Sequence, residues 1–184
     1  MAYDYHAVHA LEGTIGAMAE RRANHLSVHR ATAIAVVLAA PGKIAEAAGT
    51  LVASGEFEAR FCGPGEWLVL SDAHAPETLL ADLSLRLGDF AFAVDQSHGR
   101  VALSLSGPDA VRILANGVAA DLHPDAFPVG RAANMRCNHL SVNIARKGPD
   151  SFDLVVTRSF AEALVDELKV MARGYDLSVD FATR

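Results

Sequence analysis

The stretch "DQSHGRVALSLSGPDA", residues 95–110, carries the local pattern from which the fold can be predicted. Within it, "VALSLS" alternates strictly, so Val101, Leu103 and Leu105 share one face of a predicted strand. Pro108 and Asp109 then suit the first turn of a helix. The preceding "DQSHG" predicts a corner between two strands. The stretch therefore predicts a corner, a half-buried strand and a helix in that order.

The same plan occurs earlier in the chain and is completed on both sides. "VVLAAPGKIAEAA" repeats the order strand, proline, helix, and "EWLVLSDAHAPETLLADL" parallels "SFDLVVTRSFAEALVDEL" as strand followed by helix. The sequence therefore predicts an α+β domain of two duplicated β-α-β-β-α-β halves, with antiparallel sheets and helices packed on one face. The halves span about 30–96 and 97–184.

Residues 1–29 lack this regularity and are predicted to form an N-terminal arm. Two interpretations stay open: a poorly ordered terminus, or a segment that becomes ordered only against a partner. The pentapeptide "NHLSV" occurs at 24–28 and again at 138–142. These two copies do not fall at equivalent positions of the duplication, so we interpret the identity as coincidence.

Composition narrows the class of protein. The 184 residues are 51% hydrophobic and 21% charged, which is typical of a globular domain that needs no metal or disulfide to complete its core. The net charge is -6 without a basic stripe, so nucleic acid is not an expected partner. We expect no membrane span and no signal peptide. Two distant cysteines, Cys62 and Cys137, indicate a reduced, cytoplasmic protein.

Asp95, Ser97 and His98 raise the question of a hydrolytic site. Neighbouring side chains of an extended backbone point to opposite faces, so Ser97 and His98 cannot pair there as nucleophile and base. The "GxSxG" elbow of lipase-type enzymes is also missing. We therefore predict no catalytic residue in the chain, and a corner in which Asp95 and Ser97 bind local backbone donors.

Metal ligation is not predicted either. His25 and His29 have the i, i+4 spacing of a helical metal site but lack the acid of "HExxH", and residues 27–28 favour a strand. Cys137 and His139 are expected on one strand face, with no close-spaced second pair. The other histidines considered as companions are His98 and His123.

Four residues are candidates for contact with a partner protein. Trp67 follows the turn "GPGE" and is either a core aromatic or a contact residue. Asp121 and His123 lie in the loop "DLHP", where they bind either neighbouring backbone or a partner. Arg158 precedes the last helix and is either an exposed ion pair or a contact.

Several phrases occur together that resemble the γ subunit family of heterotetrameric sarcosine oxidase. They are "GPGEWLVL", "SHGRVALSLSGPDA", "DLHPDAFPVG" and "FDLVVTRSFAEALVDEL", and the resemblance spans residues 60–173. The wider group is similar to the aminomethyltransferase of the glycine cleavage system, which has a similar Asp-x-Ser-His followed by Ser-Gly-Pro-Asp-Ala. The resemblance implies a folate-binding, aminomethyltransferase-like fold. The candidate ligand-binding residues that the resemblance implies are Asp95, Ser97, His98, Arg100 and His139.

The resemblance also implies a division of labour. Aminomethyltransferases engage folate through an acid at the start of a later strand, here "NHLSVNIA", where Asn138 and His139 stand instead. A neutral amide and a histidine do not replace a carboxylate. The chain is therefore expected to be an accessory subunit that packs against a larger one and helps to enclose its folate-side cavity.

For the whole oxidase, the resemblance implies oxidative demethylation of sarcosine to glycine, with hydrogen peroxide and transfer of a one-carbon unit to tetrahydrofolate. Tetrahydrofolate, FAD, FMN and NAD are expected in the α, β and δ partner subunits, and no Rossmann fingerprint occurs in this chain. The alternative is a stand-alone module that binds folate or another small ligand without catalysis.

Overall fold

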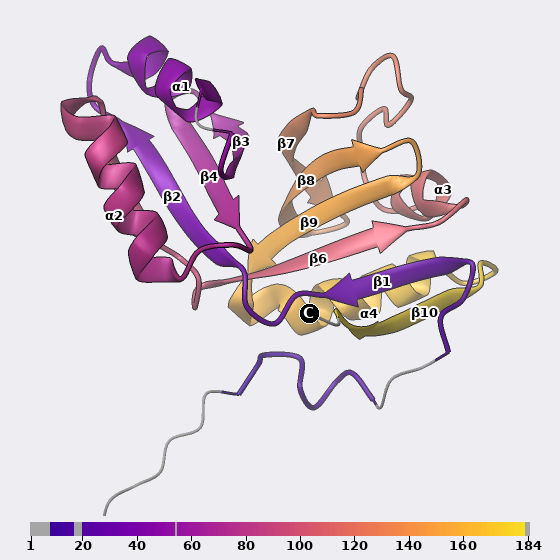
Figure 1. The fold of residues 1–184 in the computed structure, drawn as a ribbon. Helices are drawn as coiled ribbons and strands as arrows, with labels where there is room; N and C mark the ends of the chain where they lie inside the picture. Colours follow the sequence, from indigo (N-terminus) through magenta and orange to yellow (C-terminus); the bar gives the residue numbers. More distant parts are fainter. Residues whose placement is uncertain (1–7, 17–19, 54, 183–184) are drawn as a thin grey trace, which may run out of the picture.

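A computed structural model describes residues 8–16, 20–53 and 55–182, and within them the chain forms two β-sheets with helices on their outer faces (Figure 1). The strands are β1 (Asn24–Val28), β2 (Ala33–Ala39), β3 (Glu58–Gly63), β4 (Glu66–Ser71), β5 (Ala91–Asp95), β6 (Arg100–Ser106), β7 (Ala132–Cys137), β8 (Leu140–Gly148), β9 (Ser151–Thr157) and β10 (Leu177–Phe181). The α-helices are α1 (Ile44–Ala53), α2 (Pro76–Leu87), α3 (Ala110–Ala115) and α4 (Ala161–Met171). Short 3-10 turns lie at Gly88–Phe90 and Arg158–Phe160. None of the described helices is long and apolar enough to cross a membrane.

The smaller sheet has the strand order β3-β4-β2-β5, and all of its pairs are antiparallel. Helices α1 and α2 cover one face. Val37, Trp67 and Val69 point from the sheet toward Leu79 and Leu83 of α2 and become part of one buried cluster. The buried leucines of α2 are therefore what attach this helix to the sheet.

The larger sheet has the order β10-β1-β6-β9-β8-β7, with α3 and α4 on its outer face. The predicted alternation of "VALSLS" is confirmed: Val101, Leu103 and Leu105 are buried beneath the helices. Ser104 and Ser106 point to the opposite face, toward the smaller sheet's side of the molecule.

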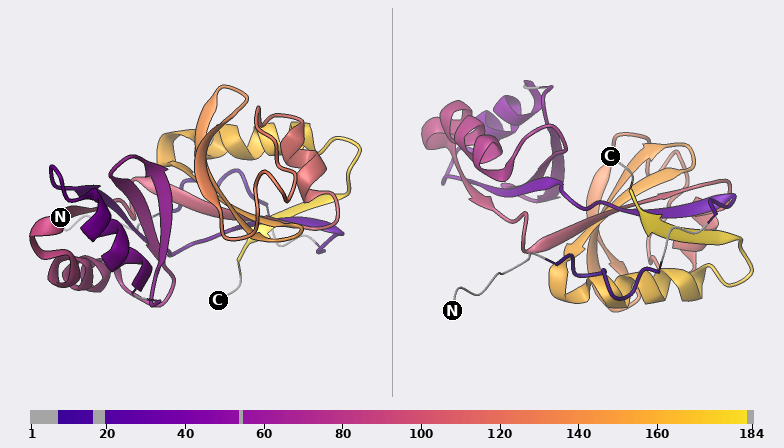
Figure 2. Two further views of the ribbon diagram at one scale, coloured as in Figure 1. Left: turned by 90° about the horizontal axis from the view of Figure 1, so that it is seen from above. Right: turned by 60° about the horizontal axis from the view of Figure 1, so that its bottom comes forward.

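The two sheets meet along a narrow apolar contact. Ile34, Leu68 and Leu70 of the smaller sheet pack against Ala102 and Val155 of the larger one. The molecule is therefore layered as helices, sheet, sheet and helices, and the sheets diverge away from this contact (Figure 2). The α+β class, the antiparallel pairing within each half and the helices on one face of each sheet agree with the sequence prediction.

One pairing and one boundary differ from the expectation. β1 pairs antiparallel with β6 and parallel with β10, so the larger sheet is mixed rather than antiparallel. Residues 24–28 were expected to belong to an arm, but Leu26 and Val28 are fully buried inside this sheet. The expected boundary after residue 29 is therefore wrong. Residues 1–7 and 17–19 of the expected arm lie outside the described residues.

The strand expected at "NHLSVNIA" begins after a turn and forms the second half of a hairpin. β7 and β8 pair antiparallel, and Asn138 and His139 form the turn between them. Asn138 has a φ of 51°, a left-handed conformation that asparagine adopts more readily than most residues. The second half therefore contains one strand more than the first. The two "NHLSV" copies occupy different structures: the first is β1, and the second is the turn together with the first residues of β8.

Candidate functional site: the cleft between the sheets

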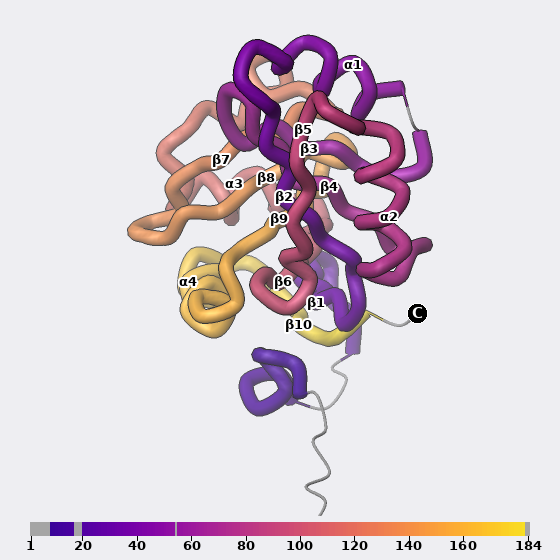
Figure 3. Tube along the Cα trace, turned by 90° about the vertical axis from the view of Figure 1, so that its left-hand side faces the viewer, coloured from indigo at the N-terminus to yellow at the C-terminus, as the bar shows by residue number. Residues whose placement is uncertain are grey.

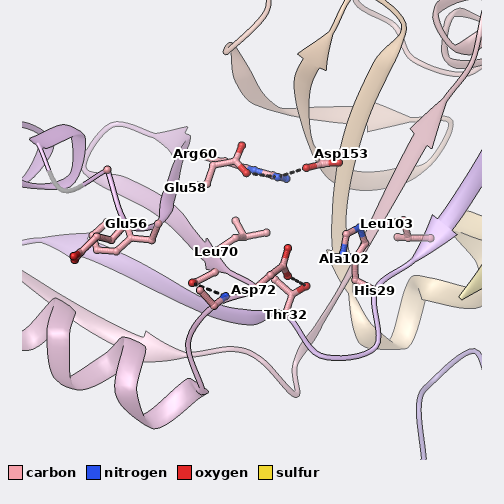
Figure 4. Close-up of a pocket in the computed structure, with 14 residues that line it drawn as sticks. His29, Thr32, Glu56, Glu58, Arg60, Leu70, Asp72, Ala102, Leu103 and Asp153 are labelled. Atoms are coloured by element: carbon pink, nitrogen blue, oxygen red, sulfur yellow. Dashed lines mark hydrogen bonds and ion pairs between the residues drawn. The ribbon is translucent and has the colours of Figure 1, made fainter. Parts of the chain in front are cut away.

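A cleft of about 360 Å³ opens where the two sheets diverge (Figure 4). Its walls come from β3 and β4 on one side and from β6 and β9 on the other, with the linkers at 29–32 and 71–73 at its margin. The lining is rich in carboxylates. The acidic side chains are Glu56, Glu58, Asp72 and Asp153.

Arg60 of β3 lies at the centre of this wall and is 2% exposed. Its Nη2 donates to Glu58 of the same strand and to Asp153 of β9, each at 2.8 Å. Its Nε and Nη1 have no partner among the described residues. Burial raises the pKa of Glu58, but hydrogen bonds from Arg60 and Lys147 outweigh it and hold that pKa below its usual value. Arg60 thus joins the two sheets by charge.

Asp153 continues into a second set of hydrogen bonds across the larger sheet. The Ser104 hydroxyl donates to the Asp153 carboxylate at 2.6 Å, and His29 Nε2 lies 2.7 Å from the same hydroxyl oxygen. A hydroxyl has a single proton. Because that proton goes to Asp153, His29 must donate to Ser104 and cannot accept from it. The histidine therefore does not activate this serine as a nucleophile.

The Asp95–Ser97 corner has the structural role that the sequence predicts for it. The Ser97 hydroxyl donates to Asp95 Oδ1 at 2.6 Å and accepts from the Ile34 amide at 2.9 Å. The Ser97 amide also donates to Asp95, at 2.9 Å. Burial opposes the effect, but these bonds from Ser97 and the nearby His98 lower the pKa of Asp95. Ser97 thus attaches the β5–β6 corner to β2.

The remaining candidate ligand residues, like Asp95 and Ser97, do not line the cleft. His98 is exposed in the same corner, and Arg100 is half-buried at the start of β6 with an Nε that no described residue accepts from. His139 is exposed in the β7–β8 turn, where its Nδ1 is 3.9 Å from Glu167. Among the described residues, no hydrogen bond or ion pair joins His139 to the corner. Asn138 and His139 also precede β8 rather than begin it, which corrects their expected place on a strand.

The four residues expected to contact a partner lie in three different environments: the core, an exposed loop and a contact within the chain. Trp67 is buried in the helix-covered core of the smaller sheet, which agrees with its core interpretation. Asp121 accepts the His123 amide at 2.8 Å in an exposed loop, so these two residues remain on the surface. Arg158 donates from Nη2 to the Val8 carbonyl at 2.7 Å and so binds the chain's own N-terminal segment.

Sequence reasoning missed a buried polar group at the β1–β10 pair. His25 Nδ1 lies 2.8 Å from Ser178 Oγ, and His25 Nε2 lies 3.0 Å from Asp180 Oδ1. The three residue types are those of a catalytic triad, but Ser178 is 4% exposed and also accepts the Arg22 amide at 3.0 Å. The group joins β1 to β10. Only the alternation of "NHLSV" hinted that His25 faces away from the apolar side.

The cysteines are free, and neither is placed for metal binding. Cys137 is buried beside Met171, and burial followed by the nearby Glu167 raises its pKa to about 11. Its expected face-sharing with His139 is wrong, because the turn intervenes and His139 is exposed. In the described ranges no three His, Cys, Asp or Glu side chains gather in a way that would hold a metal ion.

The fold of this chain is shared with a known class of proteins. The chain superposes on the aminomethyltransferase T of the glycine cleavage system from Bartonella henselae with a TM-score of 0.60 at 17% identity, covering 88% of this chain and 48% of the other. At that identity the likeness shows the fold alone. The chain is thus a protein of aminomethyltransferase-like fold.

Residues 26–171 match the sarcosine oxidase, gamma subunit family, and the chain belongs to that family. It is 32% identical over 138 residues to sarcosine oxidase subunit gamma of Corynebacterium sp. (strain U-96), covering 74% of this chain and 65% of that protein. It is 38% identical over 104 residues to the subunit of strain P-1, covering 56% and 50%. The aligned parts thus span only half to two thirds of the curated relatives' lengths.

One solved structure matches nearly end to end. It is a chain of the heterotetrameric sarcosine oxidase from Corynebacterium sp. U-96, determined in complex with pyrrole 2-carboxylate. The TM-score is 0.75 at 27% identity, over 95% of this chain and 99% of that one. The aminomethyltransferase-like fold and the γ subunit family expected from the sequence are both confirmed.

Proposed function

We propose that this chain is an accessory subunit of a cytoplasmic, heterotetrameric sarcosine-oxidase complex and that its work is assembly rather than chemistry. The observation that carries the proposal is the match over 99% of a chain from such a heterotetramer. Coverage of nearly all of that chain supports the proposal that this chain occupies the same place in such a complex.

The hydrogen bonds of the candidate site support an architectural role. Ser97 attaches a corner to β2, Ser104 and Asp153 lie within a network that includes Arg60, and Ser178 joins β1 to β10. Each hydroxyl already has partners that fix strands in place. His29 donates to Ser104, no histidine contacts Ser97 among the described residues, and Ser178, which lies beside His25, is buried between β1 and β10 where a substrate would not reach it.

Folate chemistry is proposed to belong to the partner subunits. The expected position of the missing acid shifts, because Asn138 and His139 form a turn. Residues 132–148, the whole β7–β8 hairpin, nevertheless contain no Asp or Glu. No register of this hairpin supplies a carboxylate for a pterin.

The proposed complex contains α, β and δ subunits beside this chain. The larger subunits hold tetrahydrofolate, FAD, FMN and NAD, and the complex demethylates sarcosine to glycine with hydrogen peroxide and transfer of the one-carbon unit. The two halves of this chain, β2 to β5 and β6 to β10, are proposed to be repeats of one unit, the second enlarged by a strand.

Co-expression with the three candidate partner subunits tests the proposal. An affinity tag on this chain is expected to recover all three in a complex that oxidises sarcosine. A chain that is stably folded yet recovers none of them would refute it. Titration of the isolated chain with tetrahydrofolate separates the alternative: saturable micromolar binding would favour a ligand-binding module instead.

A further inference from the structure

β5 is an edge strand of the smaller sheet, and one of its faces is open. It pairs only with β2 in the described sheet, while α2 lies along its other face (Figure 3). On the open face, Phe92 is 68% exposed, Val94 is 49% exposed, and Leu38 of β2, which is paired with Phe92, is 44% exposed. These three side chains form what we call the β5 surface.

The register fixes which peptide groups of β5 are already used. Ala40 N donates to Phe90 O at 2.8 Å, and Gln96 N donates to Ile34 O at 2.7 Å. Hydrogen bonding alternates along an antiparallel strand, so the peptide groups of Phe92 and Val94 also face β2. Those of Ala91, Ala93 and Asp95 consequently point outward from the sheet. They form a row of donors and acceptors next to the β5 surface.

This edge lacks the usual protection. Natural edge strands avoid pairing by means of lysine, proline, bulges or inward-pointing charges. "AFAVD" has no lysine or proline, and its pairing with β2 runs from Ala91 to Asp95 without a register shift. An unprotected edge beside exposed apolar side chains is the arrangement by which an extended segment of another chain adds a strand to a sheet.

We propose that β5 receives an extended strand from a different subunit of the complex, which adds a fifth strand to the smaller sheet and covers Phe92, Val94 and Leu38. This inference rests on the proposed function, since the strand comes from a partner subunit. A helix or a small ligand would not satisfy a row of outward peptide groups, whereas an extended backbone does. The inserted segment has apolar residues at alternate positions, matching the open face of β5.

Charge favours a different chain over a second copy. Asp89 and Asp95 are exposed near the two ends of β5. Burial opposes ionisation of Asp95, but hydrogen bonds from Ser97 outweigh it and hold the pKa of Asp95 low. Antiparallel pairing of two copies around Ala93 would bring Asp95 of each copy toward the 3-10 turn that carries Asp89 of the other. Bringing like charges together at both ends of the added pair opposes this pairing. We therefore expect basic residues on either side of the partner's apolar segment.

A matched pair of substitutions tests the proposal in the co-expressed complex. Phe92→Lys places a charge on the β5 surface, and Leu85→Lys makes the same change on α2, where Leu85 is 84% exposed. We expect Phe92→Lys to weaken binding to the partner subunits by about tenfold or more, and Leu85→Lys to leave it unchanged. Equal thermal unfolding of both variants and the unsubstituted chain shows that any loss is not one of folding.

A backbone variant and hydrogen exchange give independent readouts. Ala93→Pro removes an outward N–H while leaving the bonds to β2, so it is expected to weaken assembly as Phe92→Lys does. At residue resolution, the Ala93 amide is expected to exchange fast in the free chain and slowly in the complex, whereas the Val94 amide is slow in both.

The outcomes separate this inference from the proposed function. If the unsubstituted chain recovers no partner, the proposed function itself fails. If the unsubstituted chain recovers its partners, but the Phe92→Lys and Ala93→Pro variants bind them as tightly as the Leu85→Lys variant, the strand-addition proposal is wrong and the proposed function stands. A concentration-dependent dimer of the isolated chain that Phe92→Lys abolishes would also overturn it, by making a second copy the occupant.

Discussion

Arg60 of β3 and Asp153 of β9 join the two sheets directly, with Arg60 Nη2 2.8 Å from an Asp153 carboxylate oxygen. The apolar contact between the sheets is narrow, so this pair fixes their relative placement where side-chain packing is sparse. The arginine is almost completely buried, whereas its two carboxylate partners keep part of their surface in water. Removing the arginine's partners is therefore expected to lower the free energy of unfolding more than it would in an exposed pair.

Replacing Arg60 with Met is expected to lower the free energy of unfolding by about 2–3 kcal/mol, because Asp153 and Glu58 then lose their common partner. The value is discounted for the partial exposure of both carboxylates. Denaturant unfolding of Arg60→Met, Asp153→Asn and the double variant measures the coupling. Additive effects of the two substitutions would show that the sheets are not joined through this pair.

Ser97→Ala is expected to destabilise the chain by about 1 kcal/mol, because the Ile34 amide loses its acceptor and Asp95 loses a donor. Ser84→Ala, on the exposed side of α2, serves as the control and is expected to stay within about 0.5 kcal/mol of the parent. A serine-directed fluorophosphonate is expected to leave Ser97 unlabelled. Stoichiometric labelling at Ser97 would contradict the corner role.

The lowered pKa of Asp95 is expected to make the free energy of unfolding rise as pH rises through the acidic range. Its pKa is lowered in the folded chain, so its contribution is present above the usual aspartate value of about 4 and is lost as pH falls through the folded value. Asp95→Asn is therefore expected to be less stable than the parent at pH 7, with the difference shrinking below about pH 4. Urea unfolding across this range measures it, and a difference that grows in acid would reverse the assignment.

Gly107→Ala tests whether β1 belongs to the domain. Gly107 has a φ of 131°, and a Cβ there would lie 2.4 Å from the Ala23 carbonyl oxygen. Because that carbonyl is backbone next to β1, we expect a loss of about 3 kcal/mol or more. Gly42→Ala also has a positive φ but no atom within 4 Å of the added Cβ, and is expected to cost about 1–2 kcal/mol. Equal losses would mean that β1 is not held against this turn.

The sequence predicted the parts of the fold that local pattern determines. The alternation of 101–106 placed a strand correctly, the strand-then-helix order of "EWLVLSDAHAPETLLADL" placed β4 and α2, and turn chemistry identified the Asp95–Ser97 corner. The errors involve distant partners. β1 was not predicted as a whole because its five residues form a strand only through pairing with β6 and β10, which lie about 80 and 150 residues away along the chain.

The candidate site could be predicted only in part for the same reason. Arg60 and Asp153 are 93 positions apart, and each taken alone is an ordinary charged residue in a strand. The β7–β8 turn was missed because Asn138 and His139 lack a glycine, and only the left-handed φ of Asn138 closes the hairpin. The family resemblance, in contrast, depended on ordered phrases and was confirmed.

Native mass spectrometry of the co-expressed complex tests the central claim most directly. We expect one copy of this 19.4 kDa chain bound with one copy each of three different partner subunits. The parent and the Leu85→Lys variant should give the same assembly, whereas Phe92→Lys should release this chain. A heterotrimer of the partners that never contains this chain, although the chain is folded, would contradict the claim that it is a subunit.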